Sequence, residues 1–349
     1  IRETGEDVNL YIFNSTGNWS RDAGYNRAEY NIYNLPELSD FDGIILELNK
    51  VYNCDCVEYM RTLPNECVDL IIADPPYYKA INEKWDKQWK TEDEYLNWTQ
   101  QWFNECVRVL KPTGVFYCYG NFDILSKQKV LIFDKQLNFR QNITLSKGLR
   151  AIAGRTSDKL RMFPTASEYL LYYVKQDEFF DTPFSRIMKQ KMKELNLTQS
   201  DISKLELSKN GKPTGWVHNK LKGIQVPTEK QWIKICKLFN IRNEYNTLIE
   251  QYKNERYIFN LPVGVTDVWD FIPDKVRYGH KTQKPQDVTD RIINASSNPN
   301  DLVYIPFAGS GSEIISCVKY NRNYIATEIN NEYIENIIYK RLENVSNNN

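Results

Sequence analysis

Short apolar runs alternate with longer amphipathic stretches along most of this 349-residue chain. The runs Val68–Ala73, Val115–Tyr119 and Leu302–Ile305 are short and rich in β-branched or aromatic residues, which is typical of buried strands in a parallel sheet. Between the first two runs, apolar side chains recur at helical spacing after Thr91, the expected N-cap, with Glu94 completing a capping box. This alternation predicts an α/β fold with a Rossmann-like, doubly wound and mostly parallel sheet.

The same pattern continues on both sides of a central interruption. We expect Lys111–Gly114 to end the helix that begins after Thr91. Further strands are predicted at Val51–Asn53, Tyr169–Val174 and Tyr324–Thr327, with the α/β pattern resuming near Val268–Phe271 after the interruption. Further helices are predicted at Cys56–Thr62, at Val288–Ser296, from the glycine-rich turn after Ile305 through Val318, and at Glu332–Leu342.

A basic, helical segment at 183–242 interrupts the α/β pattern. It carries thirteen Lys and Arg against four acidic residues, an excess of nine, whereas the whole chain has a formal net charge of zero. Four helices are predicted there, three with caps: Thr198 with Asp201, Thr214 before Trp216, and Thr228 with Gln231, the third of the four ending at Gly223 and Pro227. Such a charge excess indicates a polyanionic partner. The predicted organisation is an extension (1–47), a first α/β half (48–180), an inserted helical subdomain (181–260) and a second α/β half (261–349).

Composition narrows the class of protein further. Seven scattered cysteines are an odd number, Cys54-Asp55-Cys56 has the wrong spacing for a zinc site, and no histidine pair completes one, so we expect reduced thiols and no metal. No apolar run is long enough to cross a membrane, and the polar start at Ile1 does not resemble a signal peptide. The expectation is a cytoplasmic protein.

The tetrapeptide Asp74-Pro75-Pro76-Tyr77 directly follows a predicted strand. In open α/β sheets, ligands bind at the carboxyl ends of the strands. A carboxylate and a proline carbonyl can accept hydrogen bonds from an amino group, two prolines keep the backbone rigid, and an aromatic face can stack on a base. The alternative is a simple strand-ending turn, for which Asp and Pro are equally suited.

A second candidate site is the strand-to-helix turn Phe307-Ala308-Gly309-Ser310-Gly311. Its glycines allow a ligand close to the backbone, the helix N-terminus favours a carboxylate, and Phe307 could lie against a nucleoside. Glu328 ends the next strand and is placed to bind a ribose diol. No Gly-Lys-Ser/Thr follows, and residue 314 is Ile, so a nucleoside with an amino-acid tail fits better than a phosphate-loop ligand or a dinucleotide. The alternative is a generic glycine turn with a solvated glutamate.

Together, in this order, the two motifs resemble the beta class of S-adenosylmethionine-dependent amino-methyltransferases of DNA. The resemblance covers about 48–180 and 265–344, and the stretches Val51–Cys56, Arg108–Gly114 and Gly279–Pro285 support it. It implies a permuted class I methyltransferase fold that binds S-adenosylmethionine and double-stranded DNA. It also implies a reaction with adenine N6 of a flipped base, because Asp rather than Ser stands at position 74. Cytosine N4 remains the alternative, and RNA a weaker one.

The resemblance assigns roles residue by residue. Asp74 and the Pro75 carbonyl, with Pro76 beside them, would hold the amino group, and Tyr77 would stack on the base. The residues expected to contact the cofactor are Asp55 at its adenine, Glu328 at its ribose, and Asp74, Thr282, Lys284, Phe307, Gly309, Ser310 and Gly311 toward its methionine end. Three residues depart from the family pattern: Lys281 in the box before the second half, Ile305 before Pro306, and Glu313 after the glycines.

Leu197–Ile202 resembles the second helix of Cro-like and phage-repressor-like helix-turn-helix domains. Thr214–Lys222 would then be the recognition helix, and the expected DNA-contacting residues are Thr214, Trp216, His218, Asn219, Lys220 and Lys222. The loop Leu207–Pro213 is longer than such domains usually have. A solvated helical insertion and a dimerisation arm of a possible homodimer are alternatives. For the whole chain, a non-catalytic helix-turn-helix regulator is the rival function, motivated by Ile305.

Overall fold

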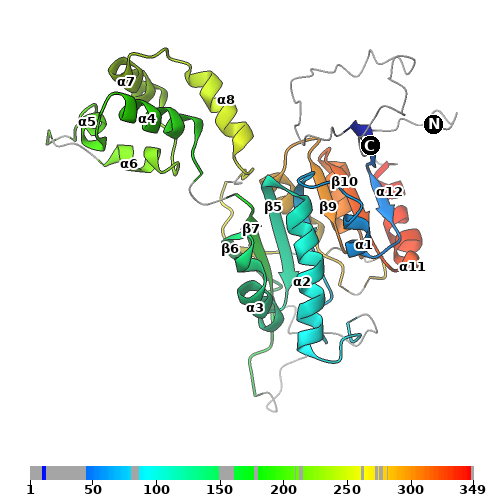
Figure 1. Ribbon diagram of the computed structural model, residues 1–349. Coiled ribbons are helices and arrows are strands. Elements are labelled where there is room, and N and C mark those ends of the chain that lie inside the picture. Colours follow the sequence, from blue (N-terminus) through cyan, green and yellow to red (C-terminus); the bar gives the residue numbers. More distant parts are fainter. Residues whose placement is uncertain are drawn as a thin grey trace, which may run out of the picture. The chain divides into compact units, whose positions relative to one another are not determined.

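The computed structural model (Figure 1) divides into two compact units: Ile1–Lys175 with Ile258–Asn349, and Gln176–Tyr257. The second of these units corresponds to the stretch 181–260, for which the sequence predicts an inserted subdomain. The residues that the structure describes are 10–12, 45–79, 86–148, 161–176, 180–208, 210–211, 215–260, 263–271, 274, 278–280 and 282–346. The predicted departure Lys281 and the predicted DNA contact Thr214 therefore lie outside the described residues.

The first unit contains a mostly parallel sheet, as predicted. Within the described residues it has eight strands in the order β3-β10-β9-β4-β5-β7-β6-β8. Neighbours from β3 through β5 are parallel, β7 runs antiparallel to both β5 and β6, and β8 is parallel to β6. The strands are β3 (Lys50–Tyr52), β4 (Val68–Ala73), β5 (Leu110–Gly120), β6 (Asn138–Ser146), β7 (Ser167–Val174), β8 (Val268–Asp270), β9 (Leu302–Ile305) and β10 (Asn323–Thr327). A separate pair joins β1 (Leu10–Ile12) to β2 (Ile45–Glu47).

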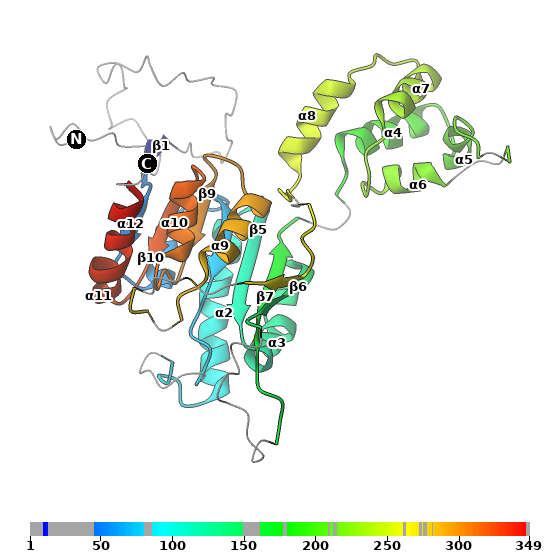
Figure 2. The same cartoon turned by 180° about the vertical axis from the view of Figure 1, so that it is seen from behind.

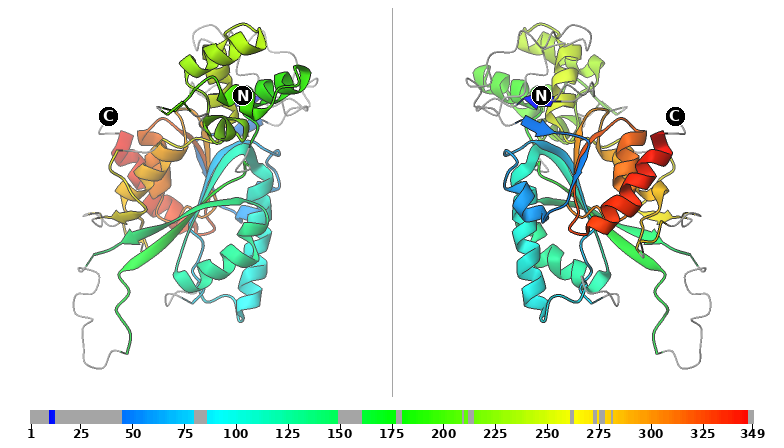
Figure 3. Two further views of the ribbon diagram at one scale, coloured as in Figure 1. Left: turned by 90° about the vertical axis from the view of Figure 1, so that its left-hand side faces the viewer. Right: turned by 90° about the vertical axis from the view of Figure 1, so that its right-hand side faces the viewer.

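Helices cover both faces of this sheet, which makes it doubly wound (Figures 2 and 3). One face carries α1 (Cys56–Met60), α2 (Glu92–Val109) and α3 (Phe122–Leu131). The opposite face carries α9 (Gln286–Ser296), α10 (Ser312–Lys319) and the C-terminal helical stretch of α11 (Asn331–Tyr333), a π-helical turn (Ile334–Ile338) and α12 (Tyr339–Ser346). The predicted final helix, Glu332–Leu342, is therefore longer than expected and contains a π-helical turn.

An aromatic core fixes α2 and α3 against the sheet. Trp102 and Phe103 on α2, Phe116 on β5 and Phe133 after α3 are fully buried, and neighbouring rings pack edge to face or at a tilt. Asp69 is the one charged residue of β4, and its carboxylate binds the Lys111 ammonium at 2.6 Å and accepts the Leu302 N–H at 2.9 Å. This charge therefore aligns the starts of β4, β5 and β9.

Two local predictions need correction, and two elements were not predicted. Helix α2 ends at Val109, but Lys111–Gly114 continue directly as part of β5, with a register shift in the pairing of β4 with β5 between Val68 and Leu70. Thr91 caps α2, yet the Glu94 carboxylate accepts the Lys90 N–H, so the capping box is not reciprocal. Helix α3 and strand β6 were not predicted, because their residues lack a clear apolar period and β6 exposes much of its length.

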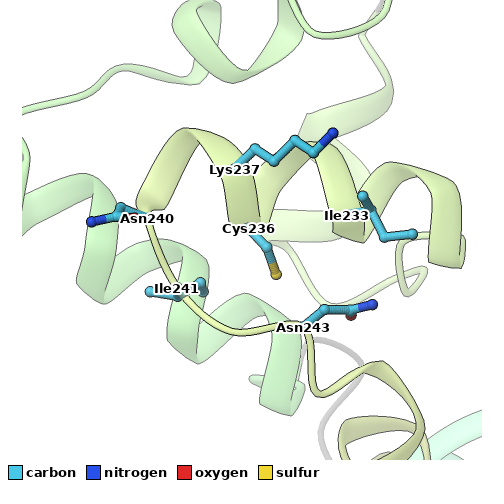
Figure 4. Close-up of a pocket in the computed structure, with 6 residues that line it drawn as sticks. All are labelled: Ile233, Cys236, Lys237, Asn240, Ile241 and Asn243. Carbon is cyan, nitrogen blue, oxygen red and sulfur yellow. The ribbon is translucent and has the colours of Figure 1, made fainter.

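The second unit is helical. Its helices are α4 (Pro183–Glu194), α5 (Gln199–Ser203), α6 (Trp216–Leu221), α7 (Glu229–Phe239) and the unpredicted α8 (Tyr245–Glu255). Reciprocal capping boxes at Thr198 with Asp201 and at Thr228 with Gln231 are confirmed. Helix α6 has Gly215 as its N-cap, so the predicted cap at Thr214 is wrong by one residue. A hollow of about 500 Å³ lies at the C-terminal end of α7 (Figure 4), and none of the predicted site residues lines it.

No helix within the described ranges is both long and apolar enough to cross a membrane.

Candidate active site

The two motifs come together because their strands are neighbours. Strand β4 pairs with β9, β9 with β10, and β10 with β3, all in parallel, so their carboxyl ends meet at one edge of the sheet. Asp74–Tyr77 leave β4, Phe307–Gly311 leave β9, Glu328 follows β10 and Asp55 follows β3. This edge is where open α/β sheets bind ligands.

A closed network surrounds Asp74. Its carboxylate accepts the Tyr77 hydroxyl at 2.7 Å and pairs with the Lys284 ammonium at 2.8 Å. Lys284 also donates to the Tyr77 hydroxyl oxygen at 2.9 Å, and its ammonium lies 5.1 Å from the Tyr77 ring centroid and 4.8 Å from that of Tyr119. Lys284, predicted as a cofactor contact, therefore holds the predicted base-binding residues in place.

Lys284 is only 5% exposed at its side chain and remains charged. Burial disfavours the ammonium, but the Asp74 and Glu168 carboxylates outweigh this effect and raise the pKa of Lys284. Burial likewise disfavours the Glu168 carboxylate, but Lys284 and Lys147 hold its pKa below the usual value. The three site groups Asp74, Lys284 and Glu168 thus form one coupled ionic cluster.

The proline turn is tied to the helix layer. The buried Tyr95 of α2 donates its hydroxyl to the Pro76 carbonyl at 2.6 Å, and Gln128 of α3 donates to the Tyr95 oxygen at 3.1 Å. Two prolines already restrict this backbone. The hydrogen bonds from the helices therefore fix the direction of the loop as well as its internal shape.

The second loop binds Glu328 through its backbone. Gly309 has a φ of 50°, and its N–H donates to Glu328 at 2.8 Å, while the Asn330 N–H donates to the other carboxylate oxygen at 2.9 Å. Burial raises the pKa of Glu328, and these backbone donors oppose the rise. The predicted ribose contact is thus oriented by the glycine loop itself.

Gly311 is the N-cap of α10 and has a φ of 73°, a left-handed conformation that side chains rarely adopt. A Cβ there would approach Ile338 to 3.1 Å. The Arg341 guanidinium donates to the Ser310 carbonyl at 2.7 Å and to the Ser312 hydroxyl at 3.1 Å, so α12 supports the loop from behind. Ser310 itself is buried, with its hydroxyl 3.2 Å from that of Ser312.

The remaining predicted cofactor residues have partners within the fold. The Phe307 ring packs against Trp98 and Trp102, with centroids 5.7 and 5.4 Å away. The Asp55 carboxylate caps α1 by accepting the Val57 N–H at 2.8 Å. The Thr282 hydroxyl lies 3.5 Å from the His280 imidazole, whose ring also approaches Gly309.

Sequence reasoning assigned no role to several side chains that line this edge. Tyr95, Tyr119, Glu168 and His280 come from elements whose spatial neighbours only the sheet order reveals. Glu313 was noticed only as a departure from the family pattern. It is buried, and its Oε1 atom has no hydrogen-bond partner among the residues that the structure describes.

The predicted DNA-contacting residues of α6 differ in exposure. His218 and Lys222 are exposed, and Asn219 is half-buried. Trp216 packs against the core of the helical unit, and Lys220 is 7% exposed and donates to Gln225 at 2.9 Å. In this conformation Trp216 and Lys220 contribute to the packing of the subdomain, while His218, Asn219 and Lys222 are accessible.

Within the described part of the chain, no cluster of three or more His, Cys, Asp or Glu side chains is arranged to hold a metal ion.

Comparison with known families identifies the class. The profile of the DNA methylase family, which covers methylation at N6 and N4 amino groups, matches residues 68–340. This match spans well over half of the chain, and the chain therefore belongs to this family. Methylation of DNA with S-adenosylmethionine as the methyl donor is the reaction of the family.

Individual relatives are distant. The chain is 25% identical over 317 residues to the Type II methyltransferase M.HinfI of Haemophilus influenzae, covering 85% of this chain and 69% of that protein. It is 29% identical over 329 residues to the Type II methyltransferase M.BamHI of Bacillus amyloliquefaciens, covering 89% of this chain but only 62% of that protein. Among solved structures, that of the M1.HpyAVI–SAM complex aligns with a TM-score of 0.46 and 19% identity, over 84% of this chain and 98% of that one.

Proposed function

We propose that the chain is a beta-class enzyme that methylates N6 of adenine in double-stranded DNA, with the target base turned out of the helix. The observation that carries the proposal is the Asp74–Tyr77 loop at the shared strand edge, held by Lys284 and Tyr95. In the family that the sequence resembles, an acid rather than a serine at the first position accompanies adenine. Adenine's amino group has two N–H donors, and both need acceptors.

The residues of the site suit the cofactor. Glu328 offers a half-buried carboxylate for the ribose, and Gly309 and Gly311 give the loop its left-handed turns. The buried Oε1 atom of Glu313 has no hydrogen-bond partner within the described part of the chain. When bound, S-adenosylmethionine supplies an electrophilic methyl group. Phe307, Gly309, Ser310, Gly311 and Glu328 would hold it, with Asp55 and Thr282 at the rim.

The protein's own groups would prepare the acceptor nitrogen. The amino lone pair of adenine is delocalised into the ring and is a poor nucleophile. Asp74 and the Pro75 carbonyl would accept its two N–H bonds, concentrate electron density on nitrogen and orient it. Positioning of this kind, together with preorganised electrostatics, supplies the rate. Tyr77 would offset the cost of unstacking the base, which is a few kcal/mol.

Identification of the methylated base tests the proposal. DNA from cells that express the protein is digested to nucleosides and examined by mass spectrometry, and modification-sensitive sequencing then locates the site. N6-methyladenine is the expected product. N4-methylcytosine would contradict the base assignment while keeping the family reaction, and the absence of any methylated base would favour a non-catalytic DNA-binding protein. The variant Asp74→Ser then tests whether this position governs the choice of amino group.

The helical unit Gln176–Tyr257 is the proposed target-recognition subdomain, with α5 and α6 as a helix-turn-helix. Its support is the basic excess of the segment 183–242 and the accessible His218, Asn219 and Lys222. Lys222→Ala should weaken DNA binding similarly on all sequences and reduce the salt slope by about 1. Asn219→Ala should instead reduce the preference for the target sequence. An unchanged salt slope and an unchanged preference would contradict a DNA-facing α6.

A further inference from the structure

Glu313 is the second residue of α10, directly after the glycine loop. The residue is 4% exposed, and within the described structure its Oε1 atom has no hydrogen-bond partner. Buried carboxylates are normally paired, because an isolated one loses its hydration without compensation. The known parts of the site do not use this oxygen, so its position calls for a ligand.

The charged and titratable groups that face Glu313 come from several elements: Asp74 after β4, Tyr119 on β5, Lys284 before α9, Cys317 on α10 and Arg341 on α12. Both cations already serve other atoms. Lys284 binds Asp74 and Tyr77, and Arg341 donates to the Ser310 carbonyl and, at 2.9 Å, to Gln286. The site therefore has one more carboxylate than its own cations satisfy directly.

Burial and, after it, the nearby Asp74 carboxylate raise the pKa of Glu313 to about 7. The free protein thus holds this group close to half protonated at neutral pH. A cation that arrives beside it would favour the ionised form and release the proton.

We propose that Glu313 binds the ammonium group of the amino-acid end of S-adenosylmethionine. An ammonium has three donors and no acceptor, and a carboxylate accepts only, so the two are complementary. The backbone N–H groups at the start of α10 suit the carboxylate of the same amino-acid end. The inference rests on the proposed role of Phe307–Gly311 as the binding loop for that end.

Calorimetry tests the proposal without DNA and without turnover. S-adenosylhomocysteine, which carries the same amino-acid end, is titrated into the protein at pH 7 in two buffers of different ionisation enthalpy. We expect release of about half a proton for each ligand bound, as a group of pKa 7 requires. Glu313→Gln should release none and bind at least about tenfold more weakly, as loss of a charge-assisted hydrogen bond implies. The control Glu335→Gln, at an exposed position in the π-helical turn Ile334–Ile338, should match the wild type in both respects.

His280 also lies beside the loop, and burial lowers its pKa below the usual 6.5. The pH dependence is therefore measured between 6.5 and 7.5, above the lowered pKa of His280. The affinity of the wild type should rise about threefold across this window, and that of Glu313→Gln should stay flat.

A second ligand removes any dependence on the variant folding correctly. The wild type should bind the analogue of S-adenosylhomocysteine that lacks the amino group at least about tenfold more weakly, and without proton release. Equal affinity for the two ligands, or the same proton release in Glu313→Gln as in the wild type, would overturn the proposal. Because DNA is absent, this failure is distinct from failure of the adenine assignment, which changes the methylated base and leaves cofactor binding intact.

Discussion

The loops that follow β4 and β9 lie side by side, yet they differ in how far their polar groups are already paired. Around Asp74, the acid, the phenol and the ammonium satisfy one another, and two prolines and Tyr95 immobilise the backbone. Around Gly309 and Gly311, the backbone is left-handed, and the neighbouring Glu313 has a buried oxygen that no described residue satisfies.

The difference indicates two strategies for binding. The β4 loop is preorganised, so its acceptors are in place before any base arrives and need little reorganisation. Beside the β9 loop, Glu313 stays partly protonated until a cationic ligand arrives, which couples cofactor binding to the release of a proton. Changes in the first loop should therefore alter rate or stability, and changes in the second should alter affinity.

The largest expected effect comes from Asp74→Asn, which keeps the size of the side chain but removes its charge. Methyl transfer to DNA should fall by about 1,000-fold or more, because the strongest acceptor for the amino group is lost. Affinity for S-adenosylhomocysteine should change by less than about threefold. Single-turnover methylation and calorimetry measure the two quantities, with the exposed Asp123→Asn as the control. A wild-type rate in Asp74→Asn would overturn the mechanism.

Lys284→Met tests whether the β4 loop is held by charge. It leaves the Asp74 and Glu168 carboxylates without their buried partner, so the free energy of unfolding should fall by about 3 kcal/mol. Urea-induced unfolding measures this loss. The control Lys319→Met breaks an ion pair at a half-exposed lysine and should cost less than about 1 kcal/mol. Equal losses in the two variants would show that the ionic cluster does not stabilise the loop.

The pH dependence of that loss has a defined sign. The pKa of Glu168 in the folded protein lies below its usual value of 4.5, after Lys284 and Lys147 overcome the effect of burial. Its contribution to stability is present above pH 4.5 and disappears as the pH falls through the lower folded value. The stability difference between the wild type and Lys284→Met should therefore narrow below pH 4.5.

Glu328→Gln tests the second loop. The amide still fills the space but binds a ribose diol more weakly, so the affinity for S-adenosylhomocysteine should fall about tenfold. At saturating cofactor, the methylation rate should remain within about threefold of the wild type. Calorimetry and saturation kinetics separate these quantities, with the exposed Glu332→Gln as the control. A rate loss that saturating cofactor does not restore would contradict the division between the loops.

The smallest effect is expected for Tyr77→Phe. The variant loses the hydroxyl contacts with Asp74 and Lys284 but keeps the ring that would stack on the base, so the rate should fall only about threefold to tenfold. Tyr77→Ala also removes the ring, so its methylation rate should fall by a further factor of about ten, because one stacking contact is lost. If Tyr77→Phe lowered the methylation rate as much as Tyr77→Ala, the main role of Tyr77 would be its hydroxyl network rather than stacking.

Much of the fold follows from local patterns. Strands β4, β9 and β10 are short apolar runs, and the caps Thr91, Thr198 and Thr228 precede amphipathic stretches, so each could be predicted from its own residues. Strand β6 and helix α3 lack such periods. The pairing of β6 with β7 and β8, and the packing of α3 on the aromatic core, stabilise them.

The motifs at 74–77 and 307–311 were visible in the sequence because their chemistry is local: a rigid acid–aromatic turn, and a glycine turn before a helix. Their order along the chain determined the family and the kind of reaction. The partners of these motifs were not visible. Lys284 is more than two hundred residues from Asp74, and Glu168 enters through an antiparallel strand. The strand order, the paired state of Asp74 and the unpaired state of Glu313 depend on which distant groups burial brings together, and only the tertiary structure decides this.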